Sequence, residues 1–378
     1  MKPKLLLLQI AFVAIGWALL GYAQPPLFIA APPAAVGDGS GHLVLADVNR
    51  DGKLDLIAQH LMQQVVTVQL GDGTGRFAMA SGSPLKLDYR PVEAKVGDIN
   101  GDGMPDLAVA RGDRDAVDIF FGDGTGKFKL APSSPFHVST AEYNTGLQLL
   151  DINGDGKLDL LTTHNQRNSF ATLLGDGRGG VAKGATTTFP AGQGRYSFAF
   201  GDLDGDKHLD VAITNTGNGN FIDPGRVIVL RGDGQGAFKL WSETSLATGA
   251  RYVTMGDLNN DQRMDLAFTH SGGTISTLLN QGQGKFTTGT GYDLQSDLFG
   301  VAIADANGDQ KNDLVVATVN SVTVLLNELT QFTLAPGAPY KAGPGAYHLA
   351  IGDVNRDGKM DIAASSFEGK VVTVLLRR

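Results

Sequence analysis

Clusters of aspartate at fixed spacing are the residues of this sequence best suited to chemistry. The nine-residue motif D-x-[ND]-x-D-x-x-x-D occurs seven times, beginning at Asp47, Asp98, Asp151, Asp202, Asp257, Asp305 and Asp353. Carboxylates held this close together repel one another unless a cation neutralises them. Side-chain oxygens at positions 1, 3 and 5 and a backbone carbonyl at position 7 form the start of a calcium loop, which Asp at position 9 closes here.

We therefore predict up to seven structural Ca²⁺ ions, in loops 47–55, 98–106, 151–159, 202–210, 257–265, 305–313 and 353–361. The expected ligands at positions 1, 3, 5, 7 and 9, taken loop by loop, are Asp47, Asn49, Asp51, Lys53, Asp55; Asp98, Asn100, Asp102, Met104, Asp106; Asp151, Asn153, Asp155, Lys157, Asp159; Asp202, Asp204, Asp206, His208, Asp210; Asp257, Asn259, Asp261, Arg263, Asp265; Asp305, Asn307, Asp309, Lys311, Asp313; and Asp353, Asn355, Asp357, Lys359, Asp361. The alternative is a set of metal-free Asx turns.

Two loop positions sharpen this prediction. Position 7 should use only its carbonyl, so its side chain should be free. Position 6 should adopt a left-handed backbone, which favours glycine. Four loops have Gly there, and we expect strained, weaker sites in the three that have Lys207, Gln262 and Gln310.

The motifs recur in a constant frame of short apolar segments. Successive motifs are 51, 53, 51, 55, 48 and 48 residues apart, and each lies between apolar runs such as Leu43–Ala46 and Val65–Leu70. About four strands per unit of this length is typical of a propeller blade. We predict an all-β fold, a single seven-bladed β-propeller of four-stranded blades over residues 24–378. The last unit ends after its third strand, and the segment Phe28–Ala31 should supply the fourth.

The first 23 residues differ from the repeats. Lys2 and Lys4 precede an apolar run from Leu5 to Leu20, and small residues follow it. This pattern predicts a signal peptide over residues 1–23 and a secreted, periplasmic or cell-surface protein without a membrane span in its mature form. An uncleaved membrane anchor is the alternative. The chain contains no Cys, so an exported form has no disulfide to stabilise it.

The Asp loops, together with the Gly-rich turn Gly71–Phe77 and its copies, resemble the FG-GAP/VCBS repeat family and the seven-bladed propeller of integrin α-subunits. The resemblance covers residues 26–378 and implies the fold and calcium ligands at positions 1, 3, 5 and 9. Blade six departs from it, because Asn327–Phe332 has lost the glycine turn. Members of the family include adhesins, lectin-like binders and lyases, so the resemblance does not imply one function.

Two sets of residues should reach the face opposite the calcium loops. One lies five residues beyond each motif: His60, Arg111, His164, Asn215, His270, Thr318 and Ser366. The other precedes each first strand: His42, Tyr89, Arg90, Tyr143, Asn144, Arg195, Tyr196, Arg251, Tyr252, Phe299, Tyr347 and His348. From these we single out a candidate ligand set: Arg90, Arg111, Tyr143, Arg195, Tyr196, Arg251, Tyr252 and Tyr347.

Aromatic rings stack on sugars and Arg pairs with carboxylate or sulfate, so these residues predict a site for a carbohydrate or an anionic polymer. Alternatively, they only terminate strands and pack loops. We expect a binding module for carbohydrate or a surface protein, without nucleic acid and without catalysis. A polysaccharide lyase or glycosidase is an alternative function, because Glu142 or Asp297 could act as its catalytic base. A second alternative is a passive structural part of an exported assembly.

Overall fold

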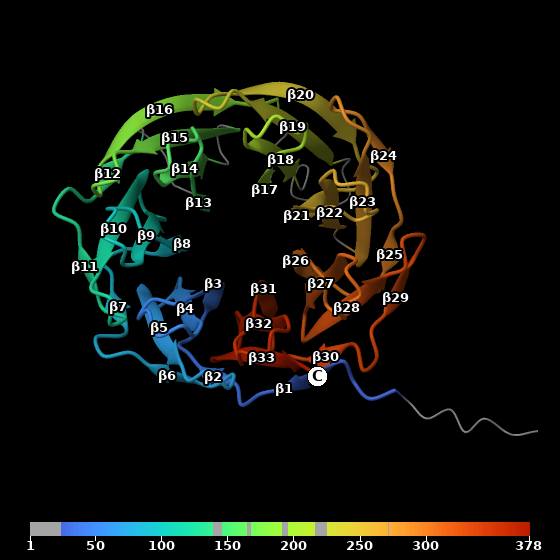
Figure 1. Ribbon diagram of the computed structural model, residues 1–378, viewed down its shortest axis with the longest axis horizontal. Coiled ribbons are helices and arrows are strands. Elements are labelled where there is room, and N and C mark those ends of the chain that lie inside the picture. Colours follow the sequence, from blue (N-terminus) through green and yellow to red (C-terminus); the bar gives the residue numbers. More distant parts are fainter. Residues whose placement is uncertain (1–23, 139–145, 165–167, 191–195, 216–224, 271) are drawn as a thin grey trace, which may run out of the picture.

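The computed structural model describes residues 24–138, 146–164, 168–190, 196–215, 225–270 and 272–378. These residues form seven antiparallel sheets arranged as a ring around a central axis (Figure 1). The predicted seven-bladed all-β propeller is thereby confirmed. The described residues contain no helix long and apolar enough to cross a membrane. Residues 1–23, with the predicted signal peptide, lie outside the described part.

Within each blade, three strands run side by side from the axis outward. The innermost strands are β3 (Ser40–Ala46), β8 (Pro91–Gly97), β13 (Gly146–Leu150), β17 (Tyr196–Gly201), β21 (Ala250–Gly256), β26 (Leu298–Ala304) and β31 (Ala346–Gly352). The second strands are β4 (Asp55–His60), β9 (Asp106–Arg111), β14 (Asp159–His164), β18 (Asp210–Asn215), β22 (Asp265–His270), β27 (Asp313–Thr318) and β32 (Asp361–Ser366). The third strands are β5 (Val65–Gly71), β10 (Ala116–Gly122), β15 (Ser169–Gly175), β19 (Arg226–Gly232), β23 (Thr274–Asn280), β28 (Ser321–Asn327) and β33 (Val371–Arg377).

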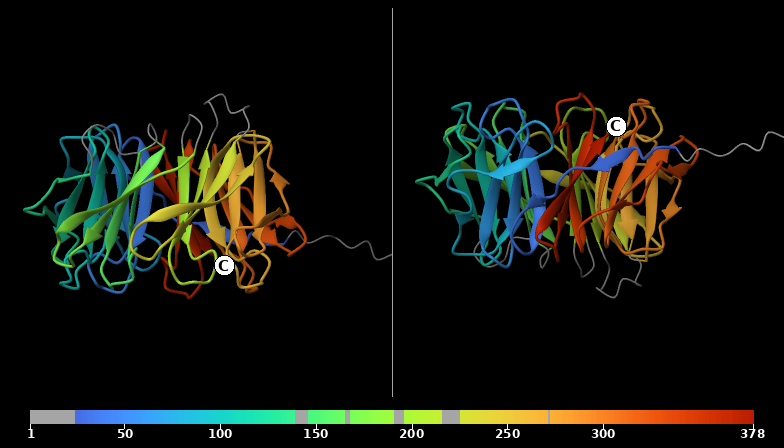
Figure 2. Two further views of the ribbon diagram at one scale, coloured as in Figure 1. Left: turned by 90° about the horizontal axis from the view of Figure 1, so that it is seen from above. Right: turned by 90° about the horizontal axis from the view of Figure 1, so that it is seen from below.

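The outermost position of a blade is continuous in two blades and split in five. The continuous strands, β16 (Val181–Thr188) and β20 (Phe238–Ser245), cross the outside of the ring obliquely (Figure 2). The split ones are β6 (Phe77–Met79) with β7 (Leu85–Lys86), β11 (Phe128–Leu130) with β12 (Phe136–His137), β24 (Phe286–Thr288) with β25 (Tyr292–Asp293), β29 (Phe332–Leu334) with β30 (Tyr340–Lys341), and β1 (Phe28–Ala30) with β2 (Ala34–Ala35).

The core lies between neighbouring blades. Six of the second strands are buried along their whole length, and so are residues 210–214 of β18, because successive side chains point to opposite faces of the sheet and both faces are covered. In β4, Ile57 packs in a cluster with blade two, whereas Leu56 packs in a cluster with blade seven. No blade can therefore bury its apolar residues alone, and the ring must close.

The N-terminal strand closes the ring as predicted. β1 pairs antiparallel with β33, with Phe28 opposite Arg377, and β2 pairs with the same strand farther along. Phe28 is 2% exposed and meets Tyr340 of blade six edge-on, with ring centroids 5.5 Å apart. The pairing satisfies the outer edge of β33, which would otherwise present unpaired backbone groups.

We expect Phe28→Ala to lower the free energy of unfolding by about 3 kcal/mol, because it opens a cavity at the closure. Ile29→Ala on the same strand is the matched control, since Ile29 is 39% exposed and should cost below about 1 kcal/mol. Urea denaturation of both variants measures the difference. Equal losses would contradict a closure held by the buried ring.

Candidate functional site

Each Asp loop is organised around the carboxylate at position 9. In blade one, Asp55 is fully buried; its Oδ2 accepts the Val48 N–H at 2.9 Å and its Oδ1 accepts the Gly71 N–H at 2.8 Å. The same two bonds recur in the other six blades. One side chain therefore ties the loop between the first two strands to the end of the third.

The backbone at position 6 is left-handed in all seven loops, as predicted. Lys207, Gln262 and Gln310 have φ of 69°, 67° and 66°, in the region that strains residues other than glycine. Position 4 is left-handed as well, which the sequence analysis missed, and Arg50, Asn260 and Arg356 adopt φ near 60° there. These two turns direct N–H groups of the loop toward side-chain oxygens; in blade one the acceptors are the carboxylates of Asp47 and Asp51 and the amide oxygen of Asn49.

The side chain at position 7 has a partner within its own loop, which the sequence analysis did not anticipate. Lys53 Nζ lies 3.0 Å from Asp51 Oδ2, and six of the seven loops have such a contact between the Lys, Arg or His side chain at position 7 and the carboxylate at position 5. The position-5 acid is one of several crowded charges, and a cation two residues later partly offsets their repulsion. Met104 has no charge, and Arg50 of blade one contacts its sulfur.

Blade four brings its acids closest together. One oxygen each from Asp202, Asp204 and Asp210 lies within 4.8 Å of the others, the one such cluster among the described residues. Arg231 approaches from the third strand, with Nε 2.6 Å from Asp204 Oδ2. Burial raises the pKa of the Asp210 carboxyl to about 6, despite the two N–H bonds that it accepts. Carboxylate oxygens are hard ligands of the kind that Ca²⁺ prefers.

On the opposite face, six of the polar residues five positions beyond a motif are buried, namely His60, Arg111, His164, His270, Thr318 and Ser366. His60 bonds Thr67 within blade one, and His270 bonds Thr248 and Ser276 within blade five. His164 Nε2 lies 2.9 Å from Asp115, which joins blade three to blade two. For these residues the structure favours the alternative of strand termination and loop packing.

Arg111, one of the candidate ligand residues, belongs to the same buried set. Its guanidinium pairs with Asp118 at 2.9 Å and lies 4.0 Å from the centre of the Tyr89 ring, leaving the side chain 8% exposed. Arg90 is exposed on the loop before β8. Tyr143, Arg195 and Glu142 lie outside the described residues, and Tyr196 is described only as the first residue of β17.

Three of the candidate residues meet at the axis of the ring. They lie within innermost strands, which begin earlier than predicted. The Tyr347 ring of β31 lies 6.0 Å from Tyr252 of β21, 5.8 Å from Phe299 of β26 and 6.0 Å from Phe367. Arg251 stacks on Phe299 at 5.7 Å and donates to the Leu298 carbonyl. Blades five, six and seven thus share one partly exposed aromatic cluster, in which Tyr252, Phe299 and Tyr347 are successively about 50 residues apart in sequence.

A polar group lies beside this cluster, on blades seven, one and two. The His42 and His348 rings are 4.5 Å apart, and His42 also meets Tyr347 at 6.0 Å. Glu93 of β8 lies 3.7 Å from His42 Nδ1 and 2.8 Å from Lys95 Nζ. We call His42, Glu93, Lys95, Tyr252, Phe299, Tyr347 and His348 the axial site.

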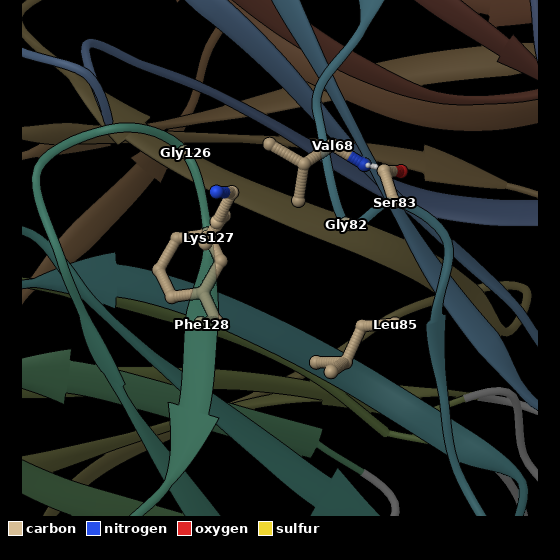
Figure 3. Close-up of a pocket in the computed structure, with 7 residues that line it drawn as sticks. All are labelled: Val68, Gly82, Ser83, Leu85, Gly126, Lys127 and Phe128. Atoms are coloured by element: carbon tan, nitrogen blue, oxygen red, sulfur yellow. Dashed lines mark hydrogen bonds between the residues drawn. The ribbon is translucent and has the colours of Figure 1, made fainter.

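The sequence analysis missed Glu93 and Lys95. Aligning the repeats would have found Glu93, because it precedes its motif by five residues, as His42, Tyr252 and His348 precede theirs. The structure also shows a pocket between the outer strands of blades one and two, lined by Val68, Leu85 and Phe128 among others (Figure 3). Lys127 is the single charged residue lining that pocket, which offers less chemistry than the axial site.

The repeats identify the family. The FG-GAP-like repeat description matches residues 47–109, 98–162, 151–213, 217–268, 257–316 and 305–364. The chain belongs to the FG-GAP-like repeat family. These overlapping segments contain all seven Asp loops, so the propeller is built from FG-GAP-like repeats throughout. No curated protein matches the sequence significantly.

Solved structures share the fold of this FG-GAP-like propeller at low identity. BBS1N, crystallised with ARL6DN, gives a TM-score of 0.64 at 13% identity and covers 93% of this chain and 98% of its own. An Agrocybe aegerita lectin that recognises non-reducing terminal N-acetylglucosamine gives 0.55 at 16%, covering 88% and 86%. A Desulfotomaculum acetoxidans protein gives 0.57 at 11%, covering 83% and 90%.

Substitutions at position 6 of the FG-GAP-like loops test whether the left-handed backbone there is strained in residues other than glycine. Replacing Lys207, Gln262 or Gln310 by Gly should raise the free energy of unfolding by about 0.5–1 kcal/mol each, because the strain disappears. The reverse change Gly358→Gln should cost about 1 kcal/mol, since a Cβ there meets nothing within 4 Å and only the backbone is perturbed. Urea denaturation with chelator present isolates the effect from metal binding.

The pH dependence of stability tests the ion pair between Glu93 and Lys95. Burial alone would raise its pKa, but Lys95, His42 and the Leu147 N–H outweigh burial and hold it at about 2, below the ordinary 4.5. A carboxyl whose pKa is lower in the folded than in the unfolded protein stabilises the fold at every pH above its unfolded-state pKa. That contribution is lost as the pH falls toward 2. Glu93→Gln should therefore cost about 3 kcal/mol at pH 7, and the difference from wild type should shrink between pH 4.5 and 2. A difference independent of pH would refute the ion pair.

Proposed function

We propose that this FG-GAP-like propeller is an exported, calcium-stabilised module that binds carbohydrate through the axial site. The observation that carries the proposal is the aromatic cluster around Tyr347, to which blades five, six and seven contribute rings. Partly exposed aromatic rings beside polar groups match a sugar, which has apolar C–H faces and a rim of hydroxyls. The structural likeness to a lectin is compatible with this use of the fold.

A carbohydrate fits the described residues better than an anionic polymer does. Arg111 is buried in an ion pair, and Arg251 is held by the Leu298 carbonyl and Phe299. Lys95 pairs with Glu93 at 2.8 Å. Among the described cations of the predicted ligand set, Arg90 alone is exposed, so the described part of that set offers one exposed cation for sulfate or carboxylate groups.

Calcium is supported by the chemistry of the seven loops. Each loop places Asp or Asn oxygens at positions 1, 3, 5 and 9 of one tight turn, together with the position-7 carbonyl. Burial raises the pKa of every position-9 carboxyl, to about 6 for Asp210 and Asp313. A bound divalent cation would offset both the burial and the mutual repulsion of these acids.

We infer that binding, not catalysis, is the role of the propeller. Asp297 is exposed on the loop before β26, and the carboxylate at the axial site, Glu93, is held by Lys95 and the Leu147 N–H. A lowered pKa makes Glu93 a poor proton donor near neutral pH. Export rests on the charged and apolar pattern of residues 1–23.

Removing calcium should lower the melting temperature by at least about 10 °C. At tenfold excess over Kd each site contributes about 1.4 kcal/mol, and seven sites act together. Calorimetry with and without EDTA measures the shift, and mass spectrometry of the metal content counts the ions. Asp202→Ala should lose one ion, whereas Asp204→Asn, which makes loop four like the other six, should lose none. Unchanged melting in EDTA would refute structural calcium.

The carbohydrate proposal is tested on a glycan array in millimolar calcium. We expect binding to a subset of neutral glycans that persists at high salt, because stacking and hydrogen bonding are screened little. Binding confined to sulfated or uronic polymers and abolished by salt would favour the anionic-polymer alternative. Release of reducing ends or unsaturated products from bound glycans would show an enzyme instead.

A further inference from the structure

Five of the innermost strands are irregular at the same place. The pairing with the second strand shifts register between Ser40 and Leu43, and equivalent shifts occur in β8, β21, β26 and β31. Such a bulge sets two residues opposite one and turns their side chains away from the regular alternation. Five axial-site residues lie inside these shifts: His42, Glu93, Phe299, Tyr347 and His348.

The polar half of the axial site has hydrogen-bonding capacity that the protein does not use. The Nδ1 atoms of His42 and His348 are buried yet have no hydrogen-bond partner in the described structure. Burial lowers the pKa of both imidazoles, that of His348 well below its ordinary value, so both are neutral at pH 7. Glu93 and Lys95 cancel each other, and the group as a whole has no net charge.

Resting on the proposed function, we propose that the axial site holds one neutral sugar ring at the end of a glycan chain, stacked on Tyr347 and hydrogen-bonded by His42 and His348. Two neutral imidazoles offer one donor and one acceptor each, which hydroxyls can satisfy and an anion cannot. The absence of net charge excludes charge as the basis of recognition.

The position of the site along the axis favours a chain end. Tyr347 and His348 are the second and third residues of a seven-residue strand, so they lie about 3–7 Å below the rim where that strand begins. A glycan lying across the rim would contact the loops. Only a terminal ring can reach past them to these side chains.

The blades around the site differ in bulk at the same repeat position. Blade three has Gly146 there and blade four has Ser197, whereas blades one, five and seven have His42, Tyr252 and His348. Gly300 of blade six is also required to be small, because a Cβ there would lie 3.0 Å from the Tyr347 carbonyl oxygen. At this repeat position the small residues of blades three and four are therefore neighbours, whereas the small residue of blade six lies between the large side chains of blades five and seven.

The test compares chain ends with chain interiors. For glycans bound on the array, the free terminal monosaccharide, supplied as its methyl glycoside, should compete in calorimetric titration. The Kd should be about the same for short and long glycans with the same end. Blocking hydroxyls of the terminal ring by methylation should abolish binding.

Substitutions in the axial site test whether the glycan binds there. Tyr347→Ala and His348→Gln should each weaken binding about tenfold, the loss expected for one stacking or one hydrogen-bonding contact. His42→Gln keeps the size of the side chain and should act in the same direction. Arg90→Ala, outside the axial site, should change Kd less than about twofold. Melting temperatures in calcium confirm that each variant is folded.

The outcomes separate the two proposals. If glycans bind but Tyr347→Ala, His348→Gln and His42→Gln all leave Kd unchanged, or internal segments compete as well as ends, the axial assignment is wrong and the carbohydrate function stands. If no glycan on the array binds the calcium-loaded protein, the carbohydrate function is refuted, and the axial assignment with it.

Discussion

The fully buried carboxylate at position 9 of each loop is the interaction on which the rest of the structure depends. Asp55 and its six equivalents each join a loop N–H to an N–H at the end of the third strand, so three strands of a blade are tied at one point. These bonds are strongest when the carboxylate is ionised, whereas burial beside other acids opposes ionisation. The ionised carboxylate is therefore needed for the geometry of the blade and disfavoured by its electrostatic surroundings, and the calcium that we propose for these loops would resolve that conflict.

Much of the architecture could be predicted because it follows from spacing. The number of motifs gives the number of blades, and their spacing gives the length of each blade. The alternation of side chains along the second strands places apolar residues on both faces of each blade. The last unit ends after β33, so its outer edge needs the segment that contains Phe28 as a partner. The left-handed position 6 follows from glycine in four loops, and the three exceptions adopt the same conformation. All these features repeat, so a prediction that is correct for one blade holds for the other six.

The axial site could be predicted only in part, because it depends on departures from the repeat. Bulges in the innermost strands have no residue signature, so the meeting of Tyr347 with Tyr252 and Phe299 could not be derived from strand alternation. The polarity of His60 and Arg111 suggested exposure, yet hairpins between the second and third strands enclose both. Polarity alone does not distinguish a ligand contact from a satisfied buried group.

The two ends of the propeller therefore differ in how they use repetition. At the end that carries the Asp loops, near-identical loops hold every blade by the same bonds, so each contribution adds to the others. At the axial end, one repeat position holds His42, Glu93, Gly146, Ser197, Tyr252, Gly300 or His348. A ring of identical residues would offer a ligand seven equivalent orientations. Because aromatic, polar and small residues occupy different parts of the ring, the ligand that we propose for the axial site would have one favoured orientation. The repeated bonds of the Asp loops fix the blades that carry these different residues.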